Sequence, residues 1–551
     1  MRLCGIKITH DGAVAVVEDG RLVMSCESEK IANRPRYSRI DELGDVEVLL
    51  GEFGYSLDDM DLVAFDGWHE PYKTRRWRGI DVEVRLGPYV EGIRSKTLIN
   101  PVRERTLDLE YVTFPHYAGH VAAAYCTSPF AVAAEPALIL SWDGLMYPYL
   151  YDCRGDLTKL RTVGALFPLV GNAYSVLAGS FPPFDQRASG FENLGLAGKI
   201  MAYAALGTPN RAAMATLDSA LKERHAACCR ESPFGTDDAF RFEAGVAQLE
   251  ALAPAMHLAD VSPVDMIASI SRYLGDRLVE SLDRALQTIP DPPRNLCLTG
   301  GTALNINWNS QIRESGLFDH VWVPPFPNDS GVALGVACCA MAVAEGRSQV
   351  EWDVYSGQRL GASPVDPAWK PSPCSLPQLA RLLDETGEPV VFLTGRAELG
   401  PRALGHRSIL APATDRAMHD RLNEMKDREA YRPVAPVCLE DAAPEIFDPG
   451  TPDPYMLFSH RVRDVWRDRL PAICHVDGTA RLQTVNKAQC PELVELLTAY
   501  REVSGMPALC NTSANFKNCG FFPDVASAMK WGKAPYIWSD GTIYEHPEVS
   551  S

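Results

Sequence analysis

The sequence lacks the long apolar runs that membrane insertion or secretion requires. No uninterrupted stretch of about 18 apolar residues occurs in the chain, so a membrane-spanning helix is not expected. The N-terminus, MRLCGIKITHDG, also lacks the apolar core of a signal peptide. These two absences predict a cytoplasmic protein.

Basic residues are scarce relative to acidic ones. The chain has 53 Lys and Arg against 71 Asp and Glu, and its formal net charge is −18. This balance argues against general binding to nucleic acid or to a membrane surface, because both are themselves negatively charged. A local cationic cluster can still bind a small anion.

Cys-x-x-Cys pairs are absent, although the chain has 15 cysteines. An odd number without such pairs argues against a disulfide framework and predicts buried, reduced thiols. At 551 residues the chain is too long for one hydrophobic core, so two or more domains are expected. Residues 350–375 are rich in Pro, Gly and Ser and are predicted to be the linker, which gives domains over 1–355 and 370–551.

Residues 114–144 hold the first candidate site. His116 and His120 are four residues apart in a stretch that favours a helix, where they share a face and can bind one metal ion. Asp143 follows the apolar run ALILS, a predicted buried strand, and α/β sheets place ligands at such strand ends. Asp329, ahead of a predicted helix, is the fourth candidate. In the alternative interpretation the imidazoles pack, Asp143 fixes a turn and Asp329 is a helix N-cap.

Two hairpin units open the two halves of the N-terminal domain. The segment from Leu3 to Ser25 reads as strand, turn, strand, turn and strand, and the segment from Leu138 repeats this order without sequence identity. Such paired units are typical of the actin-like (ASKHA) ATPases. Helices are predicted from 171, over much of 208–290 and over 264–287.

Three further stretches of this domain suit a ligand. Gly300 and Gly301 follow a predicted strand, where backbone amides can receive phosphate or sugar oxygens. Lys199 lies in a turn or helix start rich in small residues, where backbone and ligand can approach closely. The run from Arg75 to Arg78 could bind an anion, but a solvated loop is the favoured interpretation.

The C-terminal domain combines arginines with glycines. Arg402 and Arg407 lie on either side of a glycine with no acid between them, and Lys426 and Arg432 follow a predicted helix. Guanidinium groups bind phosphate in a bidentate manner and glycine permits close approach. Residues 475–485 are predicted as one strand with a polar face that includes Arg481, and residues 507–515 as a strand that ends in the polar side chains of Asn511, Thr512, Ser513 and Asn515.

These motifs together resemble a known family. GPRALGHRS (400–408), NEMKDREAYRPVAP (423–436) and NTSAN (511–515) are the most specific, and PHYAGH, GGTALN and PNDSGVALG precede them in the right order. The chain thus resembles the O-carbamoyltransferases, a family that includes tobramycin carbamoyltransferase, nodulation protein U and cephalosporin hydroxymethyl carbamoyltransferase. The resemblance covers nearly the whole chain.

The resemblance implies an α/β protein with an actin-like, Kae-like domain over 1–355 and a YrdC-like α/β domain over 370–551. It implies that the second domain makes carbamoyladenylate from ATP, with Mg, and carbamoyl phosphate. The first domain would then transfer the carbamoyl group to a hydroxyl of a small-molecule natural product.

The family pattern also implies roles for residues. The metal ligands would be His116, His120, Asp143 and Asp329, with Fe(II) implied and Zn or Mn compatible with the residue types. His10 would be a base or orienter for the acceptor hydroxyl, and Lys30, Arg34 or Arg36 would supply a basic group. The remaining implied residues are Lys199, Gly300, Gly301 and Asn305 toward the intermediate, and Arg402, Arg407, Lys426, Arg432, Arg481, Asn511, Ser513 and Asn515 toward ATP and carbamoyl phosphate.

Two competing functions fit parts of the sequence. The hairpin repeat also fits an actin-like small-molecule kinase, which would release ADP rather than pyrophosphate. A metal-binding regulatory or scaffold protein would need no turnover. Residues 66–110, rich in Trp, Tyr and Arg, are expected to form part of the acceptor pocket, and the sequence leaves a monomer and a homodimer open.

Overall fold

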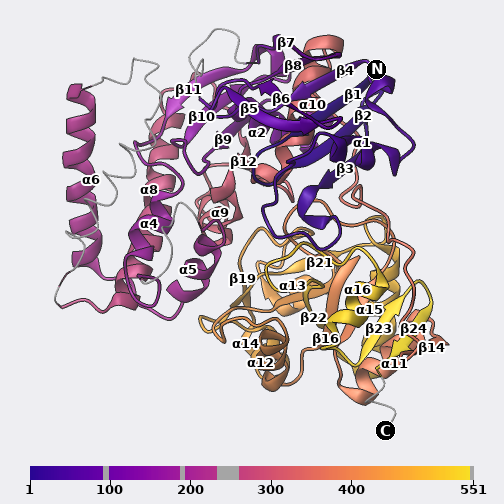
Figure 1. Ribbon diagram of the computed structural model, residues 1–551. Coiled ribbons are helices and arrows are strands. Elements are labelled where there is room, and N and C mark those ends of the chain that lie inside the picture. The colour runs from indigo at the N-terminus through magenta and orange to yellow at the C-terminus, as the bar shows by residue number, and fades with distance from the viewer. Residues whose placement is uncertain (91–98, 186–192, 232–257, 259, 547–551) are drawn as a thin grey trace. The chain divides into compact units, whose positions relative to one another are not determined.

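The computed structural model describes residues 1–90, 99–185, 193–231, 258 and 260–546 (Figure 1). Contacts within the chain divide it into two compact units. Unit 1 comprises Met1–Ser25 and Arg39–Trp352, and unit 2 comprises Cys26–Ser38 and Asp353–Ser551. Unit 2 is therefore built from two separate stretches of the chain.

Two sheets of the same topology form the framework of unit 1. Their strand orders are β3-β2-β1-β4-β8-β7 and β11-β10-β9-β12-β13. In each sheet a central strand pairs antiparallel with its hairpin partner and parallel with the next strand (β1 with β2 and β4; β9 with β10 and β12). This equivalence confirms the predicted internal repeat. The strands are β1 (Arg2–Lys7), β2 (Ala13–Glu18), β3 (Arg21–Glu27), β4 (Leu62–Phe65), β7 (Val102–Thr106), β8 (Leu109–Thr113), β9 (Ala137–Ser141), β10 (Tyr149–Cys153), β11 (Arg161–Ala165), β12 (Asn295–Thr299) and β13 (His320–Trp322).

Two helices form the buried centre of unit 1. The helix α10 (Val332–Glu345) packs on β1, β2 and β4, whereas α2 (His116–Cys126) packs on β9 and β12, and the two helices pack on each other. A Cβ added at Gly335 would lie 1.9 Å from the carbonyl oxygen of Gly119, so the helix backbones touch there. Every residue of α2 is buried, including its two imidazoles.

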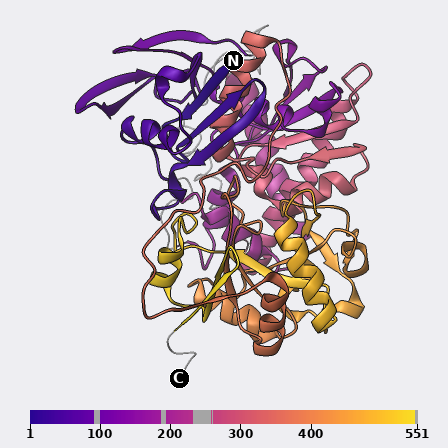
Figure 2. The ribbon, with the colours of Figure 1, turned by 90° about the vertical axis from the view of Figure 1, so that its right-hand side faces the viewer.

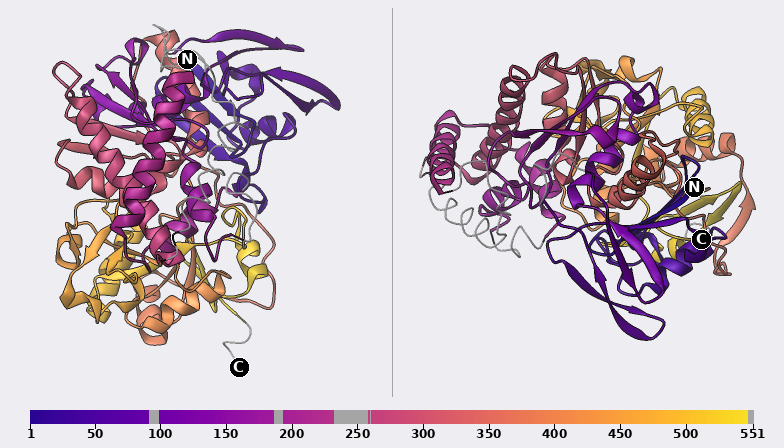
Figure 3. Two further views of the ribbon diagram at one scale, coloured as in Figure 1. Left: turned by 90° about the vertical axis from the view of Figure 1, so that its left-hand side faces the viewer. Right: turned by 90° about the horizontal axis from the view of Figure 1, so that it is seen from above.

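Most of the other helices of unit 1 follow β11 in the chain. The helix α5 packs on α4 and α8, and α6 runs beside α8 (Figure 3). The predicted helix 264–287 is confirmed as α8. These helices are α1 (Gly44–Gly51), α3 (Pro129–Val132), α4 (Ala173–Gly179), α5 (Leu196–Ala204), α6 (Arg211–Glu231), α8 (Pro263–Leu286) and α9 (Ile306–Glu314).

The arginine-rich stretch predicted as a solvated loop is a hairpin, so that prediction is wrong. It forms β5 (Tyr72–Trp77) and β6 (Ile80–Arg85), which pair antiparallel and project from the unit (Figure 2). Arg75 and Trp77 are buried, whereas Arg76 between them is exposed, which is the alternation of a strand. The Arg75 guanidinium donates to the carbonyl of Ile8 at 2.8 Å.

An eight-stranded mixed sheet forms the core of unit 2, in the order β14-β24-β23-β15-β16-β22-β17-β21. Helices α11 and α15 pack together beside it. The strands are β14 (Lys370–Pro373), β15 (Val390–Leu393), β16 (Arg407–Pro412), β17 (Ala435–Leu439), β21 (Gln483–Val485), β22 (Ala508–Ser513), β23 (Tyr536–Ser539) and β24 (Thr542–Glu545), with β18 (Phe447–Asp448), β19 (His460–Val462) and β20 (Thr479–Ala480) in a smaller sheet. The helices are α11 (Leu376–Thr386), α12 (Arg416–Met425), α13 (Ala443–Ile446), α14 (Asp464–Arg467), α15 (Pro491–Ser504) and α16 (Val525–Trp531).

The single strand predicted over 475–485 is wrong. Residues 475–478 form a turn, β20 joins the smaller sheet, and β21 joins the large sheet. The Asp477 carboxylate accepts from the backbone N–H of Thr479, which closes the turn. The Asp-Gly pair therefore acts as a turn signal here. The polar residues predicted to share one strand face do not share it; they are His475, Asp477, Thr479, Arg481 and Gln483.

The α/β class is confirmed, since both units mix helices with strands. All 13 cysteines whose side chains are described are unbridged, and 11 of them are buried as predicted. None of the described helices combines the length and apolarity that crossing a bilayer demands.

Candidate active site

Helix α2 carries two imidazoles on one face. His116 and His120 are one turn apart, and their Nε2 atoms lie 3.2 Å from each other. Both side chains are fully buried. Buried imidazoles need polar partners, because burial without them costs free energy.

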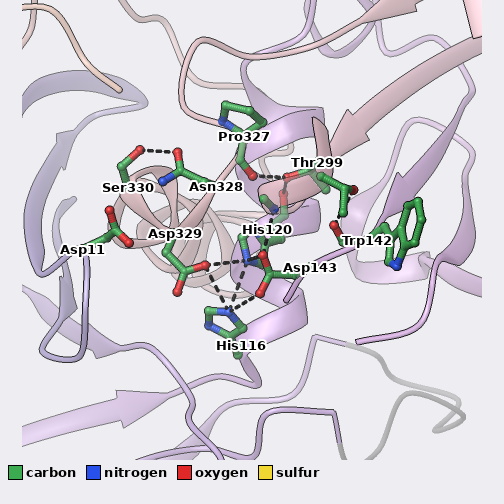
Figure 4. A network of polar contacts seen from close by, with 12 residues as sticks. Asp11, His116, His120, Trp142, Asp143, Thr299, Pro327, Asn328, Asp329 and Ser330 are labelled. Atoms are coloured by element: carbon green, nitrogen blue, oxygen red, sulfur yellow. Dashed lines mark hydrogen bonds and ion pairs between the residues drawn. The ribbon is translucent and has the colours of Figure 1, made fainter. Parts of the chain in front are cut away.

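Two carboxylates from loops complete a cluster with these imidazoles. Asp143 follows β9 by two residues, and Asp329 opens a short 3₁₀ turn (Asp329–Gly331) ahead of α10. The Oδ1 of Asp329 lies 3.3 Å from His120 Nε2 and 3.6 Å from His116 Nε2. Asp143 lies 3.8 Å from His120 and 3.9 Å from His116 through its two oxygens. Figure 4 shows the four side chains converging on one point.

The spacing of these donors suits one metal ion. Ligand atoms bound at about 2.1 Å are separated by about 3.0 to 3.4 Å in octahedral or tetrahedral geometry. The four donors lie 3.2 to 3.9 Å apart across the pairs measured. Asp329 does not cap α10, whose N-cap is Gly331 without a side-chain bond. The structural alternative for Asp329 is therefore wrong.

Neighbouring groups hold the ligands in orientation. The Asp66 carboxylate accepts from His116 Nδ1–H at 2.9 Å, which leaves Nε2 of His116 free to face the cluster. The Tyr89 hydroxyl donates to Asp143 at 2.6 Å, and its ring stacks on His116. The Gly301 amide donates to the other Asp143 oxygen at 2.8 Å.

These contacts keep the carboxylates ionised. Burial raises the pKa of Asp143, and so does Asp329, but His116 and His120 lower it further, so it lies below its usual value. Burial likewise raises the pKa of Asp329, and Lys7, His116 and His10 overcome that effect and lower it well below its usual value. The cluster thus holds two buried, ionised carboxylates that can bind a cation.

His10 lies beside the cluster on its more open side. Its Nδ1 is 2.9 Å from Asp11, and its Nε2 is 3.6 Å from the Oδ2 of Asp329. Burial lowers the pKa of the His10 imidazole, but Asp329 and Asp11 raise it by more, so it lies above its usual value. The ring meets Trp68 edge to face. The structure thus brings His10 to the predicted ligands.

The other predicted residues of unit 1 have different neighbours. The φ of Gly300 is 87°, and a Cβ there would lie 2.4 Å from the Trp142 carbonyl, so glycine is required for this close approach. Asn305 caps α9 by accepting from the backbone N–H groups of Asn307 and Trp308, and its Nδ2 is buried without a partner. Lys199 is half-buried in the first turn of α5, which packs on α4 and α8 rather than on α2.

Unit 2 contains a separate cationic cluster. It comprises four half-buried arginines, Arg402, Arg428, Arg432 and Arg481, and no carboxylate of the described residues forms an ion pair with any of them. Burial and then the neighbouring guanidinium groups lower the pKa of Arg402 to about 10 and that of Arg428 to about 9. The Nε groups of Arg402 and Arg481 are buried without a partner. Glu429 and Asp453 offset part of this charge, but like charges held together at hydrogen-bonding range of no described carboxylate suit a polyvalent anion.

Segment 26–38 contributes one basic side chain to this cluster. Arg36 lowers the pKa values of Arg402, Arg432 and Lys426 through its charge. Lys30 instead forms an ion pair with Glu27 and donates to the carbonyl of Gly400 at 2.8 Å. Of the three residues that the sequence left open, Arg36 is the one that adds charge to the cluster.

In unit 2, hydrogen bonds link Lys426 to the polar residues at and just after the end of β22. The Lys426 ammonium donates to the Ser513 carbonyl at 2.7 Å, and it also contacts both the carbonyl and the side chain of Asn515. Asn511 donates to Gln483 at 2.7 Å and to the Ala403 carbonyl. The motif around Lys426 and the end of β22 are therefore joined.

Arg407 differs from Arg402 in its surroundings. Its side chain is 1 % exposed, and its guanidinium donates to the carbonyls of Thr394, His406 and Gly395. These bonds occupy its donors within the protein, so Arg407 braces the turn rather than facing the cationic cluster. The expectation that Arg407 contacts the anion is corrected accordingly.

Comparison with known proteins identifies the family. The family model described as carbamoyltransferase N-terminus matches residues 2–338, and the model described as carbamoyltransferase C-terminus matches residues 380–534. The chain belongs to the carbamoyltransferase family. It is therefore an enzyme, a carbamoyltransferase, as the sequence motifs predicted.

Named relatives extend over the whole carbamoyltransferase chain. It is 45% identical to nodulation protein U of Sinorhizobium fredii, with 100% of both chains covered. It is 34% identical to the 3'-hydroxymethylcephem-O-carbamoyltransferase of Streptomyces clavuligerus, with 96% of each chain covered. A solved ROK family glucokinase from Streptomyces griseus matches at 16% identity and a TM-score of 0.27, over 61% of this chain and 98% of that one. A TM-score this low carries no argument.

Sequence reasoning missed the residues that surround the candidate metal ligands of this carbamoyltransferase. Asp66, Lys7 and Tyr89 contact the ligands directly, yet none was predicted as a site residue. One signal was available, since Asp66 follows the apolar strand β4 and precedes a glycine, as Asp143 follows β9. No local sequence pattern indicates that Lys7 or Tyr89 is a site residue.

Proposed function

We propose that this carbamoyltransferase makes carbamoyladenylate from ATP and carbamoyl phosphate and transfers the carbamoyl group to a hydroxyl of a small-molecule natural product. The observation that carries the proposal is the cationic cluster, because four arginines that form no ion pair with a described carboxylate suit an anionic substrate. The name of the cephem relative supports a hydroxyl acceptor, since it specifies a hydroxymethyl group and O-carbamoyl transfer.

Unit 2, which we propose to be YrdC-like, would carry out the first half-reaction. Formation of carbamoyladenylate releases pyrophosphate from ATP and phosphate from carbamoyl phosphate, and it consumes one water. Arg36, Arg402, Arg428, Arg432 and Arg481 would bind the phosphates, with Mg bound to ATP. Their charge would stabilise the negative charge that develops during transfer.

Unit 1, which we propose to be actin-like and Kae-like, would carry out the second half-reaction. The acceptor hydroxyl attacks the carbamoyl carbon, the bond to the phosphate oxygen breaks, and AMP leaves. His10 lies on the open side of the cluster, where its imidazole would orient the hydroxyl and receive its proton. Gly300, Gly301 and Lys199 are proposed to line the path of the intermediate.

The four-ligand cluster would hold the metal of this reaction. His116, His120, Asp143 and Asp329 supply two nitrogen and two oxygen donors, which fit Fe(II), Mn or Zn. A bound ion would polarise the carbamoyl carbonyl. Asp66 and Tyr89 would keep the ligands oriented toward it.

The test is a product assay on the full chain. Protein supplied with ATP and Fe(II) should release pyrophosphate only when carbamoyl phosphate is also added. Arg402→Ala should abolish this release, whereas Arg501→Ala, an exposed arginine of unit 2 paired with Glu445, should not. Release of ADP instead of pyrophosphate would favour a kinase, and the absence of any turnover by folded, metal-loaded protein would refute the proposal.

A further inference from the structure

Lys7 is an ammonium buried next to the four-ligand cluster. Its side chain, at the end of β1, is 0% exposed. The Nζ lies 3.0 Å from the Oδ2 of Asp66 and 3.0 Å from the Oδ2 of Asp329, and it donates to the Thr9 hydroxyl at 2.8 Å. The ring of Trp68 lies 4.6 Å from the ammonium on another side.

The two carboxylates that Lys7 joins have different roles. Asp329 turns its Oδ1 to the imidazoles and its Oδ2 to Lys7, so one carboxylate serves the cluster and the ammonium together. Asp66 accepts from His116 Nδ1–H and also contacts Lys7. Lys7 therefore contacts the candidate ligand Asp329 directly, and it reaches the candidate ligand His116 through Asp66.

The charges of this region balance a divalent cation. Asp66, Asp143 and Asp329 contribute three negative charges, and Lys7 contributes one positive charge. His10 and Asp11 lie at the open side and pair with each other. The remaining two negative charges equal the charge of one divalent ion. Without Lys7 the metal-free cluster would hold three buried carboxylates and no cationic group other than the imidazoles.

We propose that Lys7 is a built-in counter-cation that keeps the cluster charged and ordered when it is empty and weakens its affinity for the divalent ion. The inference rests on the metal site of the proposed function. An ammonium close to the ion repels it, and Coulomb energies at such distances amount to several kcal/mol even at an effective dielectric constant of about 20. A lysine that only braced the fold would have no such effect on metal affinity.

The test replaces Lys7 with methionine, which has a similar length and no charge. In the metal-free protein, Lys7→Met should lower the melting temperature by on the order of 10 °C, because two buried carboxylates lose the ammonium between them. Titration with Mn²⁺, followed by the electron paramagnetic resonance of the free ion, should give a dissociation constant at least about tenfold lower than that of the wild type. Mn²⁺ should also raise the melting temperature of this variant by more than that of the wild type.

A matched control and a second variant make the outcome decisive. Lys159→Met, which removes an exposed lysine paired with Asp156, should leave Mn²⁺ affinity unchanged. If Lys7→Met does not fold, the double variant Lys7→Met/Asp66→Asn should fold, because it restores the charge balance. Failure of this double variant to fold would overturn the inference, as would Mn²⁺ affinity of Lys7→Met equal to or weaker than the wild type. Wild-type protein that binds no Mn²⁺ would instead refute the metal site itself.

Discussion

Replacing Arg402 with methionine should make the ligand-free protein more stable. Burial, and after it the charges of Arg36 and Arg432, lower the pKa of Arg402 from 12.5 to about 10. A shift of this size corresponds to about 3 kcal/mol against the charged form. Because Arg402 is half-buried, solvent screens part of this repulsion, and we expect a gain of about 1 to 2 kcal/mol in the free energy of unfolding.

Arg407 provides the matched comparison, five residues away in the same motif. Its guanidinium satisfies buried carbonyls, so Arg407→Met should cost about 3 kcal/mol or more. The two variants thus remove the same charge with opposite effects on stability. Arg402→Met should lose pyrophosphate release while it gains stability, as expected where a binding site holds repelling charges.

Urea denaturation of both variants beside the wild type would measure these effects. The far-UV circular dichroism midpoint should move to higher urea for Arg402→Met and to lower urea for Arg407→Met. Addition of ATP should reduce the difference between Arg402→Met and the wild type, because bound phosphate supplies the missing counter-charge to the wild type alone. Equal destabilisation of the two variants would refute the assignment of Arg402 to an anion site.

Three further changes test the surroundings of the two clusters. Gly300→Ala would bring a Cβ against the Trp142 carbonyl, whereas Gly316 has a similar φ and open space around it. Gly300→Ala should therefore destabilise unit 1 by at least about 2 kcal/mol more than Gly316→Ala. Similar urea midpoints for the two variants would contradict this. Tyr89→Phe removes the donor to Asp143 and should weaken Mn²⁺ binding about tenfold in the same titration, and unchanged affinity would show that this hydroxyl does not orient the ligand. Lys30→Met removes the ammonium that pairs with the buried Glu27, and it should lower the free energy of unfolding by about 3 to 5 kcal/mol in urea denaturation. The double variant Lys30→Met/Glu27→Gln should lose less. Equal losses for the single and double variants would argue against coupling of the pair.

Three of the four candidate ligands could be placed from the sequence because local structure orients them, whereas Asp329 reaches the cluster through tertiary packing. The helical period places His116 and His120 on one face, and a strand end positions Asp143. The roles of Lys7 and Tyr89 depend instead on contacts between distant parts of the chain. The sequence around a lysine in an apolar strand does not indicate which carboxylates its side chain contacts.

The arginines of unit 2 show the same limit within one motif. Arg402 and Arg407 look alike in sequence, but Arg407 begins β16, where carbonyls of the preceding turn surround it. The contribution of Arg36 was unpredictable for a related reason, because it depends on a short segment joining the unit formed by the C-terminal residues. Residues 91–98, within the stretch expected to form the acceptor pocket, lie outside the described residues.

The discontinuity of unit 2 has a consequence for synthesis on the ribosome. Residues 26–38 emerge early, but the rest of unit 2 begins only at Asp353. At the usual rates of translation the early segment must wait on the order of tens of seconds for its partners. During that interval Glu27, Lys30 and Arg36 lack the Gly400 turn and the arginines that surround them in the finished protein. The nascent chain therefore carries an unsatisfied basic segment that chaperones could bind, and a gene cut at residue 352 would express a C-terminal half without its Arg36.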